Sequence, residues 1–156
     1  MINTILIGLG SNIGDKEGYL NNALEHLSQH DSVEVVAVSG FSETKAESQV
    51  DQPHYINAAA TIKTILNIRE FFDLTCSIEQ KLGRDSKGNK DPRTIDIDIL
   101  FFNDSIISED DLIVPHPLLH EREFVLVPLS EIAPQWVHPI FQTQVSDLLT
   151  DIYATV

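Results

Sequence analysis

Two aspartates in an otherwise apolar run are the clearest sign of chemistry in this sequence. Asp96 and Asp98 alternate with isoleucines at positions 95, 97 and 99, so a strand would place the two carboxylates on one face and the isoleucines on the other. Two positions along a strand span about 6.6 Å, a separation at which two carboxylates can jointly hold a hard cation such as Mg²⁺. The alternative, which an isolated pair of this kind favours, is a strand with a solvated polar face.

Basic residues gather immediately before this pair. Positions 81–93 contain five of the 10 Lys and Arg residues, namely Lys81, Arg84, Lys87, Lys90 and Arg93. Arginine can bind phosphate oxygens through two parallel hydrogen bonds, and metal-binding acids beside basic groups are what phosphoryl transfer requires. We therefore predict a nucleotide–Mg²⁺ site, although a solvated helix end and loop would also account for the charge. The sequence has neither a GxxxxGK[ST] nor a GxGxxG loop, so the site would not use those phosphate-binding motifs.

The composition limits the class of protein. The formal net charge of −14, from 24 acidic and 10 basic side chains, excludes nonspecific binding to nucleic acid or to an anionic membrane, because such surfaces need Lys and Arg. No apolar run approaches the ~18 residues of a membrane span, and a lone cysteine, Cys76, favours the reducing cytoplasm. The 156 residues, of which 42% are hydrophobic, predict a single folded domain over 1–156.

A third group suits a planar ligand. Tyr55 and Asn57 would share one face of a strand, where an aromatic ring can stack on a heterocycle and an amide can hydrogen-bond to its edge. An ordinary strand start is the alternative.

A fourth group lies in a proline-containing segment after the aspartates. His116, His120 and Glu121 have ligand types that bind zinc, but Pro115 and Pro117 argue against a helix that would present both histidines. We expect His116 and Arg122 to contact phosphate instead. Phe124 is interpreted either as part of the site or as a packed aromatic at the start of an apolar segment.

The apolar periodicity predicts the elements that must position these groups. Strands are predicted over 2–9, 33–41, 55–65 and 95–102, helices over 16–30, 68–82 and near 144–152, and loops over 43–53 and 83–92. This β-α-β-β-α-β order is typical of an α+β, ferredoxin-like sandwich, an antiparallel sheet with two helices on one face. The carboxylates would then lie on the face without helices. The chain after 102 is expected to be an irregular extension, and Glu79 falls within the apolar stripe of the second helix.

Five segments in order resemble the 6-hydroxymethyl-7,8-dihydropterin pyrophosphokinase family of folate biosynthesis over nearly the whole chain. They are LGSNIGD (9–15), DQP (51–53) with Tyr55 and Asn57, Glu79 with Gly83 and Arg84, PRTIDIDI (92–99), and VPH (114–116) with Arg122 and Phe124. The resemblance implies a ferredoxin-like fold and transfer of diphosphate from ATP to the hydroxymethyl group of the pterin, with release of AMP.

The resemblance also implies roles on the nucleotide side. Asp96 and Asp98 are similar to the ligands of two Mg²⁺ ions, and both are expected to be catalytic together with Arg84 and Arg93. The expected ATP contacts are Glu79, Arg84, Arg93, His116 and Arg122. Lys81, Lys87 and Lys90 are expected to steer the nucleotide rather than to bind it.

On the pterin side, the resemblance implies that the rings of Tyr55 and Phe124 enclose the substrate and that Asn57 hydrogen-bonds to the edge of its ring system. Thr44 would belong to a loop that closes over the pterin. Asp96 would also contact the pterin, and whether it accepts the hydroxyl proton stays open at this point.

Three departures from the family pattern bear on activity. The loops over 44–50 and 85–91 lack residues that are common in the family, and Asp111 stands where some relatives have a basic residue near the nucleotide, which predicts weaker ATP binding. A catalytically impaired paralogue that binds pterin or nucleotide without turnover is the alternative. A different Mg²⁺-dependent phosphoryl or nucleotidyl transferase is a third hypothesis.

Overall fold

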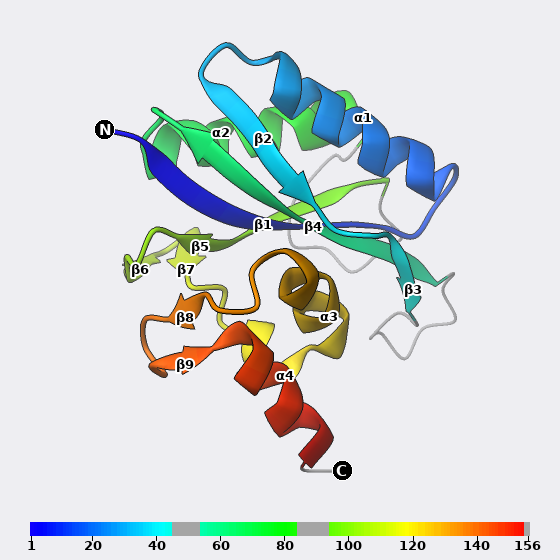
Figure 1. Ribbon diagram of the computed structural model, residues 1–156. Coiled ribbons are helices and arrows are strands. Elements are labelled where there is room, and N and C mark those ends of the chain that lie inside the picture. The colour runs from blue at the N-terminus through cyan, green and yellow to red at the C-terminus, as the bar shows by residue number, and fades with distance from the viewer. Residues whose placement is uncertain (45–53, 84–93, 155–156) are drawn as a thin grey trace.

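The computed structural model describes residues 1–44, 54–83 and 94–154 (Figure 1). Of the loops predicted over 43–53 and 83–92, residues 45–53 and 84–92 lie outside these residues, as do Arg84 and Arg93. In chain order the elements are β1 (Asn3–Ser11), α1 (Lys16–Gln29), β2 (Val33–Val38), β3 (Ser42–Thr44), β4 (Tyr55–Thr64), α2 (Ile68–Lys81), β5 (Asp96–Phe102), β6 (Ile107–Glu109), β7 (Leu112–Val114), the 3-10 helix η1 (Leu119–Glu121), α3 (Glu123–Ile132), β8 (Val137–His138), β9 (Thr143–Gln144) and α4 (Val145–Ala154).

The main sheet has the strand order β2-β4-β1-β5, with all pairs antiparallel and with β3 also paired to β4. The ferredoxin-like prediction is confirmed by this arrangement. The strand predicted over 33–41 ends at Val38, and part of the loop predicted over 43–53 is strand β3. Just after β2, Ser39 is still bound to β4, because its N–H donates to the Ala59 carbonyl at 2.9 Å and its hydroxyl accepts from the Ala59 N–H at 2.8 Å.

Helices α1 and α2 cover one face of the sheet, above it in Figure 1. The Asp15 side chain accepts from the Gly18 N–H at 3.1 Å and caps α1, as the sequence predicts. α2 is followed by Gly83 at a φ of +103°, a left-handed conformation in which glycine commonly stops a helix. The core on this face joins isoleucines of β1 and β5 to apolar residues of both helices.

Helices α3 and α4 form a second layer on the opposite face, below the sheet in Figure 1. We expected that face to carry no helix and the extension to be irregular, apart from the helix near 144–152, which is present as α4. Both faces need cover because the middle of β1 is apolar throughout: Ile5, Leu6 and Ile7 are all fully buried. The pattern did not reveal α3 because Pro128 lies inside it. None of the helices among the described residues is long and apolar enough to cross a membrane.

Candidate functional site

A row of paired residues across the sheet brings the predicted metal and pterin residues together. Gly10 of β1 is the register partner of Asn57 on β4 and of Asp96 on β5. Directly opposite residues of antiparallel strands share a face, so Asn57 and Asp96 lie on one face with Gly10 between them. Strands are about 4.8 Å apart, which places the Asn57 and Asp96 backbones about 10 Å from each other. Gly8 is paired with Asp98 in the same way.

Because Gly10 has no side chain, the Asn57 and Tyr55 side chains can lie close against β1. A Cβ atom built on Gly10 would lie 3.2 Å from Oδ1 of Asn57 and 3.5 Å from Cδ1 of Tyr55, so these side chains occupy the space that a larger residue would need. For Gly10 to pair with Asn57 and Asp96, β1 must extend beyond its predicted end at residue 9, and in the structure it continues to Ser11. Gly8 and Gly10 were not predicted as site residues, although two glycines two positions apart in a buried strand were a signal that could have indicated them.

Asp96 and Asp98 lie on the same face, as predicted. Both are half-buried, whereas Ile95, Ile97 and Ile99 are buried in the core beneath α1 and α2. Their oxygens suit Mg²⁺, which typically binds one or two carboxylates and takes its other ligands from water and phosphate. No third His, Cys, Asp or Glu completes a metal cluster among the described residues. The donor set therefore fits Mg²⁺ held jointly with a phosphate ligand. His116, His120 and Glu121, the residues considered for zinc, do not form a metal-binding cluster among the described residues either.

Glu79 of α2 is bound to the strand that carries the aspartates. Its side chain is in the core, with only 2% of the residue exposed, and its Oε2 accepts a hydrogen bond from the backbone N–H of Ile97 at 2.8 Å. Among the described residues, β5 is the outermost strand on its side of the sheet, and this N–H donates to a side chain of α2 and not to a strand. The carboxylate thus takes the place of a further strand. The predicted contact of Glu79 with ATP stays a prediction.

His116 lies beside the same strand. It follows the cis peptide bond between Val114 and Pro115, and its N–H donates to the Leu100 carbonyl of β5 at 3.1 Å. Its ring Nδ1 accepts from the Leu118 N–H at 3.3 Å, which leaves the ring proton of the neutral form on Nε2. The ring is therefore oriented as a hydrogen-bond donor through Nε2, which suits phosphate oxygens.

Arg122 and Phe124 come together at the start of α3. The Arg122 guanidinium carbon lies 5.6 Å from the centroid of the Phe124 ring, within the range of a cation–π contact. α3 packs against β4 and β3, the strands that carry Tyr55, Asn57 and Thr44, and against β1. In register, Thr44 of β3 is the partner of Tyr55 on β4. The structure therefore links the predicted phosphate and ring contacts through one helix that lies over the sheet.

The Asp111 carboxylate forms an ion pair with Arg69. Its carboxylate accepts two hydrogen bonds from Arg69, at 2.7 and 2.9 Å, and Glu109 binds the same guanidinium. The hydrogen bonds from Arg69 hold the pKa of the Asp111 carboxyl below its usual range, and the same bonds raise the pKa of Arg69. The negative charge that predicted weaker ATP binding is thus paired with a cation at the surface.

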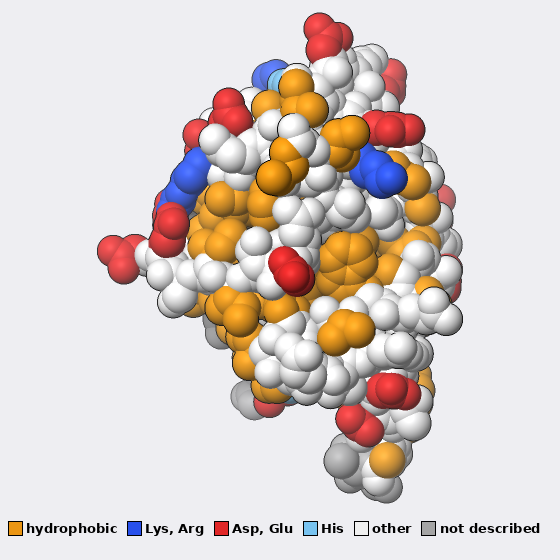
Figure 2. Space-filling model, turned by 60° about the vertical axis from the view of Figure 1, so that its left-hand side comes forward, with side chains coloured by type: hydrophobic (Ala, Val, Ile, Leu, Met, Phe, Trp, Pro, Cys, Tyr) orange, Lys and Arg blue, Asp and Glu red, His pale blue; other side chains and the backbone are white. Residues whose placement is uncertain are grey.

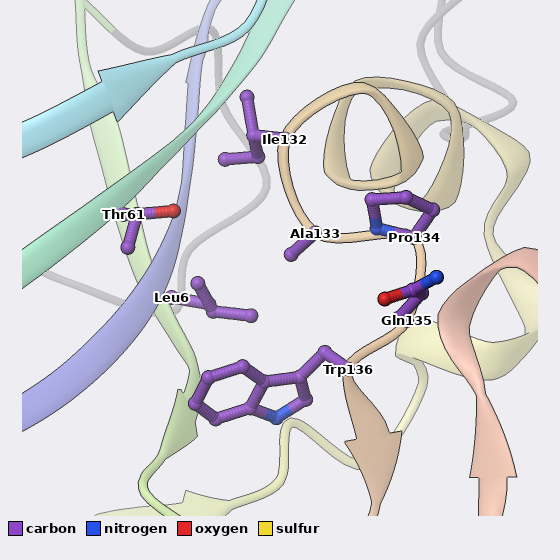
Figure 3. Close-up of a pocket in the computed structure, with 7 residues that line it drawn as sticks. All are labelled: Leu6, Thr61, Ile132, Ala133, Pro134, Gln135 and Trp136. Atoms are coloured by element: carbon purple, nitrogen blue, oxygen red, sulfur yellow. The ribbon is translucent and has the colours of Figure 1, made fainter.

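A separate pocket of about 400 Å³ lies on the α3 and α4 face of the sheet (Figure 3). Its lining includes Leu6, Thr61 and Trp136, and Figure 3 shows the Trp136 ring lying below Leu6. Leu6 is four positions from Gly10 along β1, or about 13 Å, so this pocket is distinct from the row of Asn57, Gly10 and Asp96.

Figure 2 shows one side of the molecule, on which Lys and Arg are sparse, in keeping with the net charge of −14.

Comparisons with known proteins agree on one family. A sequence model of 7,8-dihydro-6-hydroxymethylpterin-pyrophosphokinase (HPPK) matches residues 6–134. The 2-amino-4-hydroxy-6-hydroxymethyldihydropteridine pyrophosphokinase of Bacillus subtilis is 49% identical over 135 residues, which cover 86% of this chain and 81% of the relative. The Methylorubrum extorquens protein of the same name is 44% identical and covers 84% of this chain and 83% of its own length.

A solved structure shows the same fold. The Plasmodium falciparum HPPK-DHPS wild type with pteroate superposes with a TM-score of 0.80 over 99% of this chain, at 16% identity. This chain spans 43% of that longer protein, and an identity this low supports the fold alone. The family match covers Gly10, Asn57, Asp96 and Asp98. The chain therefore belongs to the 7,8-dihydro-6-hydroxymethylpterin-pyrophosphokinase family.

Proposed function

We propose that this protein transfers diphosphate from ATP to the hydroxymethyl group of 6-hydroxymethyl-7,8-dihydropterin in folate synthesis, with release of AMP and dependence on Mg²⁺. The observation that carries the proposal is the row in which Gly10 separates Asn57 from Asp96. An amide suited to the edge of a heterocycle therefore lies on the same sheet face as a carboxylate of the metal pair, with only a glycine between them.

On the pterin side, Asn57 hydrogen-bonds to the edge of the ring, and the rings of Tyr55 and Phe124 enclose its faces. Thr44, the register partner of Tyr55, lies in the segment that closes the site. Asp96 stands in the same row as Asn57 and is our candidate for the group that accepts the proton of the pterin hydroxyl.

On the nucleotide side, Asp96 and Asp98 would hold Mg²⁺, with two ions expected, and the bound metal would neutralise phosphate charge. Arg84, Arg93, His116 and Arg122 are proposed to bind the phosphates, and Glu79 belongs to this side of the site. These residues align the pterin hydroxyl with the β-phosphorus of ATP, so that catalysis rests on orientation and charge stabilisation. No covalent intermediate with the protein is needed.

The direct test is to incubate the protein with ATP, Mg²⁺ and 6-hydroxymethyl-7,8-dihydropterin and to separate the nucleotides. We expect equimolar AMP and pterin diphosphate, and no AMP when Mg²⁺ is chelated. Pterin binding without AMP would contradict the proposal and favour a non-catalytic paralogue. Release of ADP would identify an ordinary kinase instead.

A further inference from the structure

Glu79 is a buried acid whose hydrogen bond leads to the strand of the metal pair. It lies in α2 beside Ile78, in the core between helix and sheet, where a carboxylate is costly unless its oxygens are hydrogen-bonded. The bond from the Ile97 N–H, at 2.8 Å, is of the stronger kind because the acceptor can carry a charge. The side chain is therefore kept in the core by its contact with β5.

The bonded N–H belongs to the peptide group that joins Asp96 to Ile97. A peptide group is planar, so fixing its N–H also fixes the orientation of the chain immediately after the Asp96 Cα. Ile97 is itself buried, with 1% exposed, and in the part of the chain that the structure describes no strand pairs with the outer edge of β5. Without an acceptor at this point, the outer edge of β5 would lose the hydrogen bond that holds it between the two aspartates.

We propose that Glu79 is a positioning residue for the carboxylate pair. By holding the Asp96–Ile97 peptide group, it sets the direction in which Asp96 projects relative to Asp98, and hence the separation of the oxygens that bind the metal. This inference rests on the proposed metal role of the two aspartates. It assigns to Glu79 an action through the backbone, in place of the direct ATP contact that the family resemblance implies.

Three substitutions separate the hydrogen bond from charge and bulk. Glu79→Gln keeps an oxygen acceptor but carries no charge, Glu79→Asp keeps the charge but withdraws the acceptor by one methylene, and Glu79→Ala removes both. Ile78→Val is the matched control, because it trims a neighbouring buried side chain of α2 that lies outside the proposed site. Each variant is assayed for AMP release as a function of Mg²⁺, for KM of ATP, and for hydrogen exchange of the Ile97 amide in the ligand-free protein.

We expect Glu79→Ala to lower kcat and raise the Mg²⁺ requirement by roughly 10–100-fold, the usual effect of losing a residue that supports a metal ligand. KM for ATP at saturating Mg²⁺ should change little, and the Ile97 amide should exchange faster. Glu79→Gln, which keeps an acceptor for the Ile97 N–H, should lower kcat and raise the Mg²⁺ requirement less than Glu79→Ala does, and Glu79→Asp should be impaired despite its charge. Ile78→Val should leave the Mg²⁺ requirement unchanged.

Several results would overturn the inference. One is a Glu79→Ala variant with a normal Mg²⁺ requirement, and another is a raised KM for ATP with an unchanged Ile97 amide, which would show direct nucleotide contact. A Glu79→Asp variant that matches the wild type while Glu79→Gln fails would show that charge alone matters. If Glu79→Ala does not fold, the Gln and Asp variants decide the question. An inactive wild type would refute the proposed function, whereas the Ile97 exchange rates would still report on the hydrogen bond.

Discussion

Replacing Gly10 with alanine would add one methyl group to β1 at the position between Asn57 and Asp96. The new Cβ would lie 3.2 Å from Oδ1 of Asn57 and 3.5 Å from Cδ1 of Tyr55. The first contact is tighter than ordinary van der Waals packing, so the Asn57 amide must move by a few tenths of an ångström, as estimated from the ~3.5 Å optimum. The strand conformation of Gly10 needs no positive φ, so alanine fits the backbone.

The expected effects on folding and on binding therefore differ. Glycine-to-alanine changes at compatible positions alter the free energy of unfolding by about 1 kcal/mol or less, so the urea midpoint should stay near that of the wild type. Loss of the hydrogen bond between Asn57 and the pterin would cost up to about 1.5 kcal/mol. This corresponds to a pterin Kd about tenfold higher.

The assay is titration of pterin fluorescence, with urea unfolding measured on the same samples. Gly8→Ala is the control on the same strand, because its Cβ would meet only the methyl groups of Leu100 at an ordinary 3.5 Å, and it should leave the pterin Kd nearly unchanged. A Gly10→Ala variant that binds pterin as tightly as the wild type would refute the placement of the pterin over this row.

Further predictions follow from single side chains. Asp98→Ala should abolish AMP release while circular dichroism stays native, because the metal pair loses one ligand; wild-type turnover would disprove its role. Asp111→Asn should change KM for ATP little, because Arg69 already pairs with the Asp111 carboxylate, and a marked fall in KM would show that this charge repels the nucleotide. His138 is 2% exposed, and burial, with His120 nearby, lowers its pKa from 6.5. Since the unfolded chain takes up this proton near pH 6.5 and the folded chain only at lower pH, stability should decline as pH falls below 6.5. His138→Gln should remove this part of the decline in urea unfolding at pH 7.5 and 5.

Local signals in the sequence predicted much of the fold. The positions of α1 and α2, the alternation of Asp and Ile on β5, and the place of Glu79 in an apolar stripe depend on neighbours a few positions away. β3 and α3 were missed because their local patterns mislead: Glu43 and Thr44 lie in a polar stretch, and Pro128 interrupts the helical pattern. Arg84 and Arg93, which the local charge and the family resemblance assign to the site, lie outside the described residues.

The sequence by itself determined which chemical groups are available, because alternation along one strand puts Asp96 and Asp98 on a common face whatever surrounds it. Only the tertiary structure decided what they face. The pairing of Gly10 with both Asn57 and Asp96 joins segments separated by dozens of residues, and the bond from Ile97 to Glu79 crosses from strand to helix. Such contacts depend on strand order and register, which are set when apolar surfaces from the whole chain are buried together.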